Sequence, residues 1–380
     1  MLHDVLAGMK VLDLTQMLAG PTATMLLTDL GAEVVKIESP TGDFARYFGP
    51  PFQEGQSVTF MALNRDKRSI ALDLKVEDDV QVLRGLLEEA DILVESFRPG
   101  VMERLGFGYE AVSAINPALI YCSVSAYGQR SKAADRPGVD GIMQGVSGLM
   151  SIIGRAGDPP TKVQDPVVDS VTGYLSTIAL LAAVMDRGRT GRGTHLDISM
   201  LGSALQLQQS SLVAYVASGE IAPPSGSAAP YAAPNEAFPT SDGWIMLAAY
   251  QPARWIVLCS TLGRDDLVDH PLFATMELRI ANRPAMHAEL SRTLGTRTSA
   301  EWLDVLTRAG IMCGPVNDYA TLMADRDLEV GDLIDFVDHP VAGSVPVLRS
   351  VIATADGHAR RDRETRPAPL LGQDNDAPPW

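Results

Sequence analysis

One segment, residues 159–200, constrains the fold of this 380-residue chain more than any other. A short apolar run leads to Asp169, a longer apolar stretch extends from Val171 to Met185, and a glycine-rich loop spans Gly188 to Gly193. From Thr194 to Met200 apolar and polar side chains alternate with the period of a β-strand. The segment predicts a strand-like lead-in, an Asp at a helix start, a buried helix, a tight loop and a strand.

Asp169, at the predicted start of this helix, has two interpretations. Asp is a favourable helix N-cap, because its carboxylate accepts hydrogen bonds from the free N–H groups of the first turn. The positive end of a helix also favours an ionised carboxylate. An ionised carboxylate can attack an activated acyl group and form a covalent intermediate. The local sequence does not choose between a structural cap and a nucleophile.

The overall composition limits the class of protein. With 46% hydrophobic and 21% charged residues the chain is globular rather than disordered, and its length allows two domains. A formal net charge of −16 argues against nucleic acid or an anionic membrane as the main partner. An anionic ligand would need a local basic patch. Neither a leader peptide nor an apolar run of membrane-spanning length is recognisable, which predicts a soluble, cytoplasmic protein.

The cysteines and histidines favour neither a disulfide scaffold nor a metal site. Cys122, Cys259 and Cys313 are far apart and form no C-x-x-C pair, as is typical of proteins from a reducing compartment. None of the six histidines has a partner at metal-ligand spacing, and His195 is expected on an exposed strand face. We therefore expect no bound metal.

The first 125 residues have the alternating pattern of a parallel α/β sheet. A strand at 10–14, a helix opened by Pro21 and closed by Gly31, and a strand at 33–38 form one βαβ unit. Further predicted elements are a strand at 69–74, a helix at 77–89, and strands at 91–95 and 120–125. The fold class is therefore α/β with a parallel, helix-covered sheet. The sequence has no G-x-G-x-x-G after the first strand and no G-x-x-x-x-G-K-[ST], so a dehydrogenase or P-loop enzyme is not favoured.

Several motifs lie in the predicted loops of this sheet. They are TQMLAGP at 15–21, NRDKRS at 64–69, ESFRPG at 95–100 and RPGVD at 136–140. Together with Asp169, Gly173 and the R-x-x-T-G-x-G sequence at 187–193, they resemble the signature of the family III CoA-transferases, also called the CaiB/BaiF family. The resemblance covers nearly the whole chain, with further matches at 238–244, 314–316 and 368–372.

The resemblance implies roles for individual residues. Asp169 is the implied catalytic nucleophile. The positions implied to bind CoA are Gln16, Met17, Leu72, Lys75, Ser96, Phe97, Arg98, Arg104 and Arg136. The positions implied to support the active site or line the substrate pocket are Leu18, Tyr127, Asp140, Gly173 and Tyr231. The charges of Arg65, Lys67, Arg68 and Lys75 would lie near the CoA phosphates. The structural alternatives are a solvated basic stretch before a strand, a core position for Phe97 and a helix cap for Asp140.

The activity that the resemblance implies is acyl-CoA:carboxylate CoA transfer. Asp169 would form an aspartyl-acyl anhydride and then an aspartyl-CoA thioester, with CoA or acyl-CoA as substrate, a small carboxylic acid as acceptor, and no ATP, metal or redox cofactor. Two alternatives stay open. The α-methylacyl-CoA racemases of the same superfamily have His directly before the acidic residue at 140, whereas this chain has Val139, which cannot move a proton. A non-catalytic CoA-binding protein would have no reason to keep the Asp169 signature.

The resemblance also implies a domain organisation. It consists of a Rossmann-like large domain with a parallel sheet, a smaller inserted α+β domain, and a homodimer of two interlocked chains. The Ser-, Ala-, Gly- and Pro-rich composition near residue 225 predicts a linker or lid. We expect the first part of the large domain at 1–217, a linker at 218–235, the small domain at 236–325 and a return to the large domain at 326–380.

Overall fold

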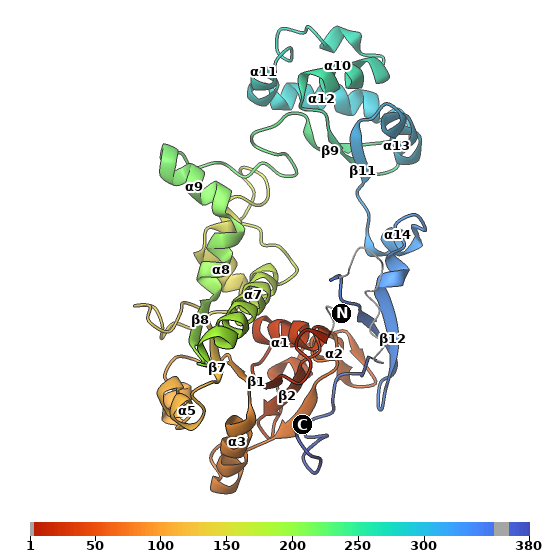
Figure 1. Ribbon diagram of the computed structural model, residues 1–380. Helices are drawn as coiled ribbons and strands as arrows, with labels where there is room; N and C mark the ends of the chain where they lie inside the picture. Colours follow the sequence, from red (N-terminus) through yellow and green to blue (C-terminus); the bar gives the residue numbers. More distant parts are fainter. Residues whose placement is uncertain (1–3, 353–364) are drawn as a thin grey trace. The chain divides into compact units, whose positions relative to one another are not determined.

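The computed structural model describes residues 4–352 and 365–380 and divides into two compact units (Figure 1). Unit 1 comprises residues 1–150, 162–221 and 331–380, and unit 2 comprises residues 151–161 and 222–330. The short segment 151–161 belongs to unit 2, although nothing in the sequence separates it from its neighbours. Two of the six histidines, His3 and His358, lie outside the described residues.

Unit 1 is built around a six-stranded parallel sheet with the order β5-β2-β1-β6-β7-β8. The strands are β1 (Lys10–Leu14), β2 (Glu33–Glu38), β5 (Arg68–Ala71), β6 (Ile92–Glu95), β7 (Ile120–Ser125) and β8 (His195–Ser199). The predicted parallel α/β sheet is confirmed. β5 ends three residues earlier than predicted, because the chain turns at Asp73, whose carbonyl accepts a hydrogen bond from the Val76 N–H.

The strand order reverses at β1. From β1 the chain moves outward through β2 to β5, then returns to β6 on the other side of β1 and moves outward through β7 to β8. Leu12 of β1 pairs with Val35 of β2 and with Leu93 of β6. Open sheets of this doubly wound order bind ligands beyond the carboxyl ends of the strands, at the point of reversal. The loops after β1 and β6 are therefore the first place to look for a site.

Both faces of the sheet are buried. In β1, Leu12 and Leu14 belong to one hydrophobic core and Val11 to the other, as alternating side chains of a central strand do. Helices α1 (Ala19–Asp29) and α3 (Glu77–Glu89) connect strands of the sheet. The other helices of unit 1, apart from α7, are α2 (Val58–Leu63), α4 (Val101–Arg104), α5 (Tyr109–Ile115), α6 (Asp140–Val146), α8 (Met200–Leu207) and α9 (Gln209–Ser218).

Smaller elements complete the described parts of unit 1 and its boundaries. Two short antiparallel hairpins are β3 (Phe52–Gln53) with β4 (Gln56–Ser57), and β12 (Ile334–His339) with β13 (Gly343–Leu348). Short 3-10 turns are η2 (Phe44–Tyr47), η3 (Leu149–Ser151) and η5 (Val330–Leu333). Gln53 donates hydrogen bonds to the carbonyls of Ala342 and Ser344, which joins the two hairpins.

Helix α7 (Val167–Thr190) is longer than the sequence predicts at both ends. It begins four residues before Val171 and continues through Gly188, so the expected loop contains only the residues after Thr190. The helix ends at Gly191, whose φ of 69° is left-handed and suits glycine. α7 is long and apolar enough to cross a membrane by length and composition. Its buried residues, such as Leu180 and Ala183, pack in the core beneath the sheet instead.

Unit 2 is an α+β fold around a three-stranded antiparallel sheet with the order β11-β10-β9. Its elements are β9 (Asn235–Pro239), β10 (Trp244–Ala248), α10 (Pro252–Thr261), η4 (Asp265–Leu267), α11 (Met276–Ala281), α12 (Arg283–Leu294), α13 (Ser299–Arg308), β11 (Met312–Pro315) and α14 (Tyr319–Ala324). Part of the expected linker at 218–235 is packed. Ala233 lies in the core, and its carbonyl accepts a hydrogen bond of 2.8 Å from the buried Arg279. Small side chains here allow close packing as well as flexibility.

Candidate active site

The loops after β1 and β6 are joined where the strand order reverses. The Gln16 N–H donates a hydrogen bond to Ser96 Oγ at 3.0 Å. Gln16 is exposed, and Phe97 beside Ser96 is half-buried and packs against the core around β1. Four of the residues expected to bind CoA (Gln16, Met17, Ser96 and Phe97) thus lie together at the edge of the sheet where a ligand is expected.

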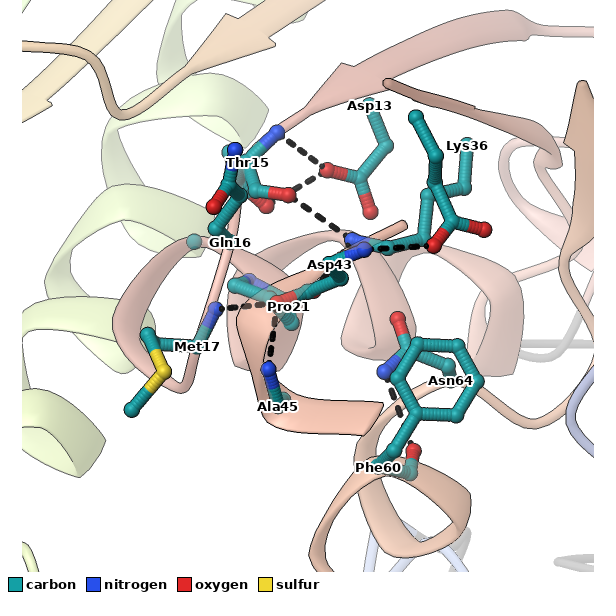
Figure 2. Close-up of polar contacts among 12 residues, drawn as sticks. Asp13, Thr15, Gln16, Met17, Pro21, Lys36, Asp43, Ala45, Phe60 and Asn64 are labelled. Carbon is teal, nitrogen blue, oxygen red and sulfur yellow. Dashed lines mark hydrogen bonds and ion pairs between the residues drawn. The ribbon is translucent and has the colours of Figure 1, made fainter. Parts of the chain in front are cut away.

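Met17 has an unusual backbone conformation in the loop after β1. Its φ is 67°, in the left-handed region that residues other than glycine rarely adopt. Its N–H donates a hydrogen bond to Asp43 Oδ1 at 3.1 Å, and the same oxygen accepts the Ala45 N–H at 2.9 Å (Figure 2). A side chain from the loop after β2 therefore holds the loop after β1.

Buried charges lie beneath this loop. Asp13, at 0% exposure, accepts hydrogen bonds from the Thr15 N–H, the Thr24 hydroxyl and Lys67 Nζ, the last at 2.9 Å. Lys36 donates to the Thr15 carbonyl at 2.8 Å and forms an ion pair of 2.9 Å with Asp43 (Figure 2). These contacts connect β1, β2 and the start of β5 under the predicted ligand edge.

The charges in this cluster compensate one another. Burial alone would raise the pKa of Asp13, but Lys36 and Lys67 lower that pKa below its ordinary value. Burial lowers the pKa of Lys36, whereas Asp13 and Asp43 outweigh it and raise the pKa. For Lys67 burial dominates and lowers the pKa to about 8. The cluster is a charge-compensated structural network rather than a group of reactive side chains.

Two basic residues expected near CoA phosphates are occupied elsewhere. Arg65 is buried and pairs with Asp29 through two hydrogen bonds of 2.6 and 2.9 Å. Lys67 is buried against Asp13, so neither side chain is open to a phosphate. The sequence pattern cannot show this, because their partners lie 36 and 54 residues earlier in the chain. Arg68 is half-buried and donates to the Pro378 carbonyl.

Asp169 is the third residue of α7 and does not cap it, which corrects the N-cap interpretation. Its exposure is 8%, and within the described residues its carboxylate accepts no hydrogen bond. Burial, and secondarily the charge of Asp140, raise its pKa to about 7. The expectation that the helix start keeps this carboxylate ionised is thus offset by desolvation. A buried carboxylate without partners is costly for stability, which is typical of a functional group.

Asp140 performs the capping role that one of the two interpretations of the sequence gives to Asp169. It is the first residue of α6, but its Oδ1 accepts the N–H groups of Val168 and Asp169 at 2.8 and 3.3 Å. Its Oδ2 accepts a hydrogen bond of 2.6 Å from the fully buried Gln144, which also binds the Val163 N–H. Asp140 therefore orients the first turn of α7 and adds negative charge beside Asp169.

Gly173 allows α1 to lie close to the start of α7. A Cβ at Gly173 would lie 2.7 Å from the Thr22 side chain and 2.9 Å from the Ala19 carbonyl oxygen. The two helices lie side by side (Figure 1). Residues four apart share a helix face, so the start of α1 lies within about one turn of Asp169. No side chain among the described residues caps α1, and its first turn has no acidic residue.

The far end of α7 places Asp169 at the same edge of the sheet as the loops. Arg187 pairs with Asp91 at 2.9 Å, at the beginning of β6. Asp169 lies 18 residues before Arg187, which corresponds to about 27 Å along a helix. A helix that returns to a parallel strand runs opposite to it, so this distance brings Asp169 beyond the carboxyl ends of the strands.

The other expected site residues are more dispersed. Arg98, which follows Phe97, is exposed beside the joined loops. Leu72 is buried at the end of β5, whereas Lys75, Arg104 and Arg136 are exposed on separate turns. Leu18 and Tyr127 are half-buried in unit 1, in the loops before α1 and after β7. Tyr231 is exposed and belongs to unit 2.

Glu95 at the end of β6 is a further candidate that the sequence analysis did not single out. It is buried, and it accepts a hydrogen bond of 2.8 Å from the Phe97 N–H. Burial raises its pKa to about 7. Ser123, which bonds to Glu95, also bonds to His195 at 2.9 Å, so His195 is half-buried rather than exposed. The sequence signal for Glu95 is a carboxylate at the end of an otherwise apolar strand. No short sequence motif marks Lys36 or Asp43 as residues of the site.

The described residues contain no group of three or more His, Cys, Asp or Glu side chains that could hold a metal ion. The three cysteines are free thiols, and burial raises the pKa of Cys122 and Cys259, which makes them unreactive.

Comparisons with known proteins identify the family. Residues 6–375 match the family model described as CoA-transferase family III. The chain is 35% identical over 370 residues to the succinyl-CoA:glutarate CoA-transferase of Mus musculus, covering 97% of this chain and 84% of that protein. It is 39% identical over 315 residues to the acetyl-CoA:oxalate CoA-transferase of Acetobacter aceti, covering 82% and 81%.

Solved structures show the same relationship. The crystal structure of a CaiB/BaiF family protein from Brucella suis superposes with a TM-score of 0.87 at 34% identity, covering 98% of this chain and 97% of that one. The orthorhombic structure of Rv3272 from M. tuberculosis gives a TM-score of 0.86 at 32% identity, with 97% and 98% covered. The chain therefore belongs to CoA-transferase family III and is a CoA-transferase enzyme.

Proposed function

We propose that the chain moves CoA from an acyl-CoA donor to a small carboxylic acid, with Asp169 as the covalent nucleophile. The observation that carries this proposal is the state of Asp169. Asp169 is 8% exposed at the start of α7, its carboxylate accepts no hydrogen bond within the described residues, and its pKa is raised to about 7. A pKa close to neutral pH leaves a substantial ionised fraction, and a poorly solvated carboxylate is a stronger nucleophile than a hydrated one.

The proposed reaction conserves the activation of the acyl group at every step. An Asp169 oxygen attacks the thioester carbonyl, the C–S bond breaks, and CoA leaves as a thiolate, which gives an aspartyl-acyl anhydride. The thiolate attacks the Asp169 carbonyl carbon and releases the donor acid, which leaves an aspartyl-CoA thioester. The acceptor carboxylate attacks that same carbon and expels the thiolate. Attack of the thiolate on the acceptor acyl carbon then releases the new acyl-CoA and free Asp169.

The surroundings of Asp169 suit these steps. Asp140 holds the first turn of α7 through the N–H groups of residues 168 and 169, so the nucleophile is oriented without a hydrogen bond to its own carboxylate. Gly173 admits the uncapped start of α1, whose positive end favours an anionic group nearby. The exposed Arg98 beside the joined loops is a suitable contact for a CoA phosphate.

The relatives suggest the substrates. Their names pair succinyl-CoA with glutarate, acetyl-CoA with oxalate and succinyl-CoA with mesaconate. All three acceptors are dicarboxylates. We extend this to the present chain and propose succinyl-CoA or acetyl-CoA as donor and a short dicarboxylate as acceptor. Gln16, Leu18 and Tyr127, all in unit 1, are the positions that we propose for acceptor selection.

We further propose that the enzyme acts as an interlocked homodimer in the cytoplasm. Exposed apolar side chains on α7, such as Tyr174 and Ile178, support an intersubunit contact. Helix α9 has no buried residue in the isolated chain and exposes Val213 and Val216. Analytical ultracentrifugation at nanomolar concentration should find a dimer, and a folded monomer would contradict this part of the proposal.

The decisive experiment traps the covalent intermediate. The purified protein is mixed with acetyl-, succinyl-, glutaryl- and oxalyl-CoA in the presence of hydroxylamine, which converts an activated aspartyl group to a hydroxamate. Intact-mass and peptide analysis should show a donor-dependent adduct at Asp169 that is absent in Asp169→Ala, while Asp186→Ala, an exposed Asp of the same helix, keeps it.

The same samples test the alternatives. An adduct at another residue, or transfer that survives Asp169→Ala, would refute the assignment of the nucleophile. Exchange of the α-proton of a chiral 2-methylacyl-CoA with deuterated solvent, without CoA transfer, would support the racemase alternative. Val139, which precedes Asp140 and is exposed, makes that result unexpected.

A further inference from the structure

The backbone of the loop after β1 is held at four polar groups of three consecutive residues. The Thr15 N–H bonds to Asp13 Oδ1 at 2.9 Å, and the Thr15 carbonyl accepts Lys36 Nζ at 2.8 Å. The Gln16 N–H bonds to Ser96 Oγ and the Met17 N–H to Asp43 Oδ1. Figure 2 shows Lys36 and Asp43 in contact with Thr15 and Met17 of this loop. The Gln16 side chain points to no partner among these and is exposed.

The Met17 contact differs from the other three because it opposes an intrinsic backbone preference. An L-residue other than glycine, Asn or Asp disfavours a φ of 67°, so the loop would relax if nothing held it. Asp43 Oδ1 is the one bond acceptor that the described structure gives the Met17 N–H. Lys36 forms an ion pair of 2.9 Å with the other carboxylate oxygen, and the Asp43 N–H donates a hydrogen bond to Glu38 at 2.9 Å.

Rigid anchoring explains how Asp43 can hold a strained residue. Glu38 is itself held by two hydrogen bonds from Arg46 and one from Ser69. Asp43 and Lys36 are both fully buried in their side chains, so no water competes for their contacts. A buried ion pair adds little stability compared with apolar side chains of similar size, but it fixes direction. This pair is therefore better suited to positioning than to stabilising.

We propose that Asp43, oriented by Lys36, is a positioning residue that clamps Met17 in its left-handed conformation and thereby shapes the acyl-CoA site. The inference rests on the proposed function, because it takes the loop at residues 15–18 as part of that site. Asp43 itself does not contact the substrate. Its effect passes through the Met17 N–H to the neighbouring Gln16 and Leu18 side chains at the point of strand reversal.

The test separates the hydrogen-bond acceptor from the charge. Asp43→Ala removes both, whereas Asp43→Asn keeps an oxygen for the Met17 N–H and removes the charge that balances Lys36. Asp43→Ala should raise KM for acyl-CoA, and Kd for CoA by calorimetry, about tenfold or more, because small displacements of a binding loop are costly. Asp43→Asn should stay within about threefold of wild type in KM and Kd while still lowering Tm.

Met17→Gly provides an independent check. Glycine adopts a positive φ without strain, so the clamp becomes less necessary. Asp43→Ala should therefore raise KM by a smaller factor in the Met17→Gly background, about threefold or less, and a double-mutant cycle measures the difference. Glu54→Gly is the matched control, because Glu54 also has a positive φ of 47° but lies in the turn between β3 and β4. It should leave KM and the effect of Asp43→Ala unchanged.

Amide hydrogen exchange tests whether Asp43 holds the Met17 N–H, independently of any activity measurement. In wild type and Asp43→Asn the Met17 N–H should exchange slowly, and in Asp43→Ala it should exchange about tenfold faster or more. Equal KM values for Asp43→Ala and Asp43→Asn, an undiminished effect in Met17→Gly, or unchanged exchange would each overturn the proposal. A wild-type protein that neither binds CoA nor transfers it would overturn the proposed function instead, with the exchange result still deciding the clamp.

Discussion

Two buried aspartates in unit 1 have opposite surroundings. Asp13 of β1 accepts hydrogen bonds from Thr15, Thr24 and Lys67, and its pKa is lowered by Lys36 and Lys67. Asp169 of α7 accepts none within the described residues, and burial with the nearby charge of Asp140 raises its pKa to about 7. The same side chain is thus a satisfied structural ion in one place and a poorly satisfied acid in the other.

The difference shows which buried carboxylate stabilises the fold and which one lowers its stability. A buried carboxylate with full compensation holds neighbouring strands together, and removing it leaves its lysine partners without a counter-charge. A buried carboxylate without compensation weakens the fold whenever it is ionised, and such groups gather at functional sites. The comparison therefore supports a structural role for Asp13 and the proposed catalytic role of Asp169, although both are Asp residues at the edge of one sheet.

The largest effect should come from replacing each aspartate by asparagine. Asp13→Asn leaves Lys36 and Lys67 undercompensated and should lower the free energy of unfolding by about 3–5 kcal/mol. Asp169→Asn should leave the free energy of unfolding unchanged or raise it at pH 7. The same variant should abolish CoA transfer. Urea unfolding at fixed protein concentration measures both, with Asp186→Asn as an exposed control within about 0.5 kcal/mol of wild type. Equal losses for Asp13 and Asp169 would mean that Asp169 is structural.

The pH dependence of stability should sharpen the same contrast. The folded-state pKa of Asp169, about 7, is above the unfolded value of 3.8, so the folded state binds more protons between these values. Wild type should therefore lose stability relative to Asp169→Asn as pH rises from about 4 to about 7, by at most about 4 kcal/mol, with no further change above. The lowered pKa of Asp13 means that its contribution stays constant over this window. A stability difference between wild type and Asp169→Asn that stays constant from about pH 4 to about pH 7 would contradict the raised pKa of Asp169.

Two glycines of α7 provide a smaller test of the approach of α1. Gly173→Ala places a methyl group 2.7 Å from Thr22, so it should lower the free energy of unfolding by about 1–3 kcal/mol and reduce kcat. The methyl group added by Gly188→Ala has no neighbour within 4 Å, so this variant should raise the free energy of unfolding by about 0.5–1 kcal/mol. Thermal unfolding and steady-state kinetics of both variants measure these effects on stability and kcat. If both behaved alike, helix propensity rather than packing would explain Gly173.

The smallest effect should come from Asp140→Asn. The amide oxygen can still accept the N–H groups of Val168 and Asp169, but the negative charge is lost. The pKa of Asp169 should then fall, so the acid limb of kcat/KM shifts to lower pH and activity at pH 6, relative to its plateau, rises about twofold or more. A pH–rate profile measures this. Asp140→Ala should also lose the cap, and a shift to higher pH in Asp140→Asn would exclude the electrostatic role.

Much of unit 1 follows from local sequence patterns. The strands at 10–14, 33–38 and 120–125 and the helix at 77–89 have the predicted bounds, because short apolar runs and an amphipathic helix are recorded in neighbouring residues. The motif resemblance also identified the family correctly. The start of α7 was placed too late and its end too early, since tertiary packing outweighs the low helix propensity of Gly188.

The contacts that define the site were less predictable. Asp140 caps a helix that begins 27 residues later, and Arg65 and Lys67 face partners from α1 and β1 rather than solvent. Lys36 looks like a solvated residue in an alternating strand, yet it is fully buried against Asp43. No local pattern records such partners, because each pair joins segments that only the packed sheet brings together.

The sequence by itself determined the parallel sheet, the helix that carries Asp169 and the membership in CoA-transferase family III, because periodicity and motif spacing are local properties of the chain. The tertiary structure alone decided which carboxylates are paired. Solvation and charge compensation depend on what surrounds a side chain in space. That is why Asp13 became a structural ion, Asp140 a helix cap and Asp169 an uncompensated acid at the edge of the sheet.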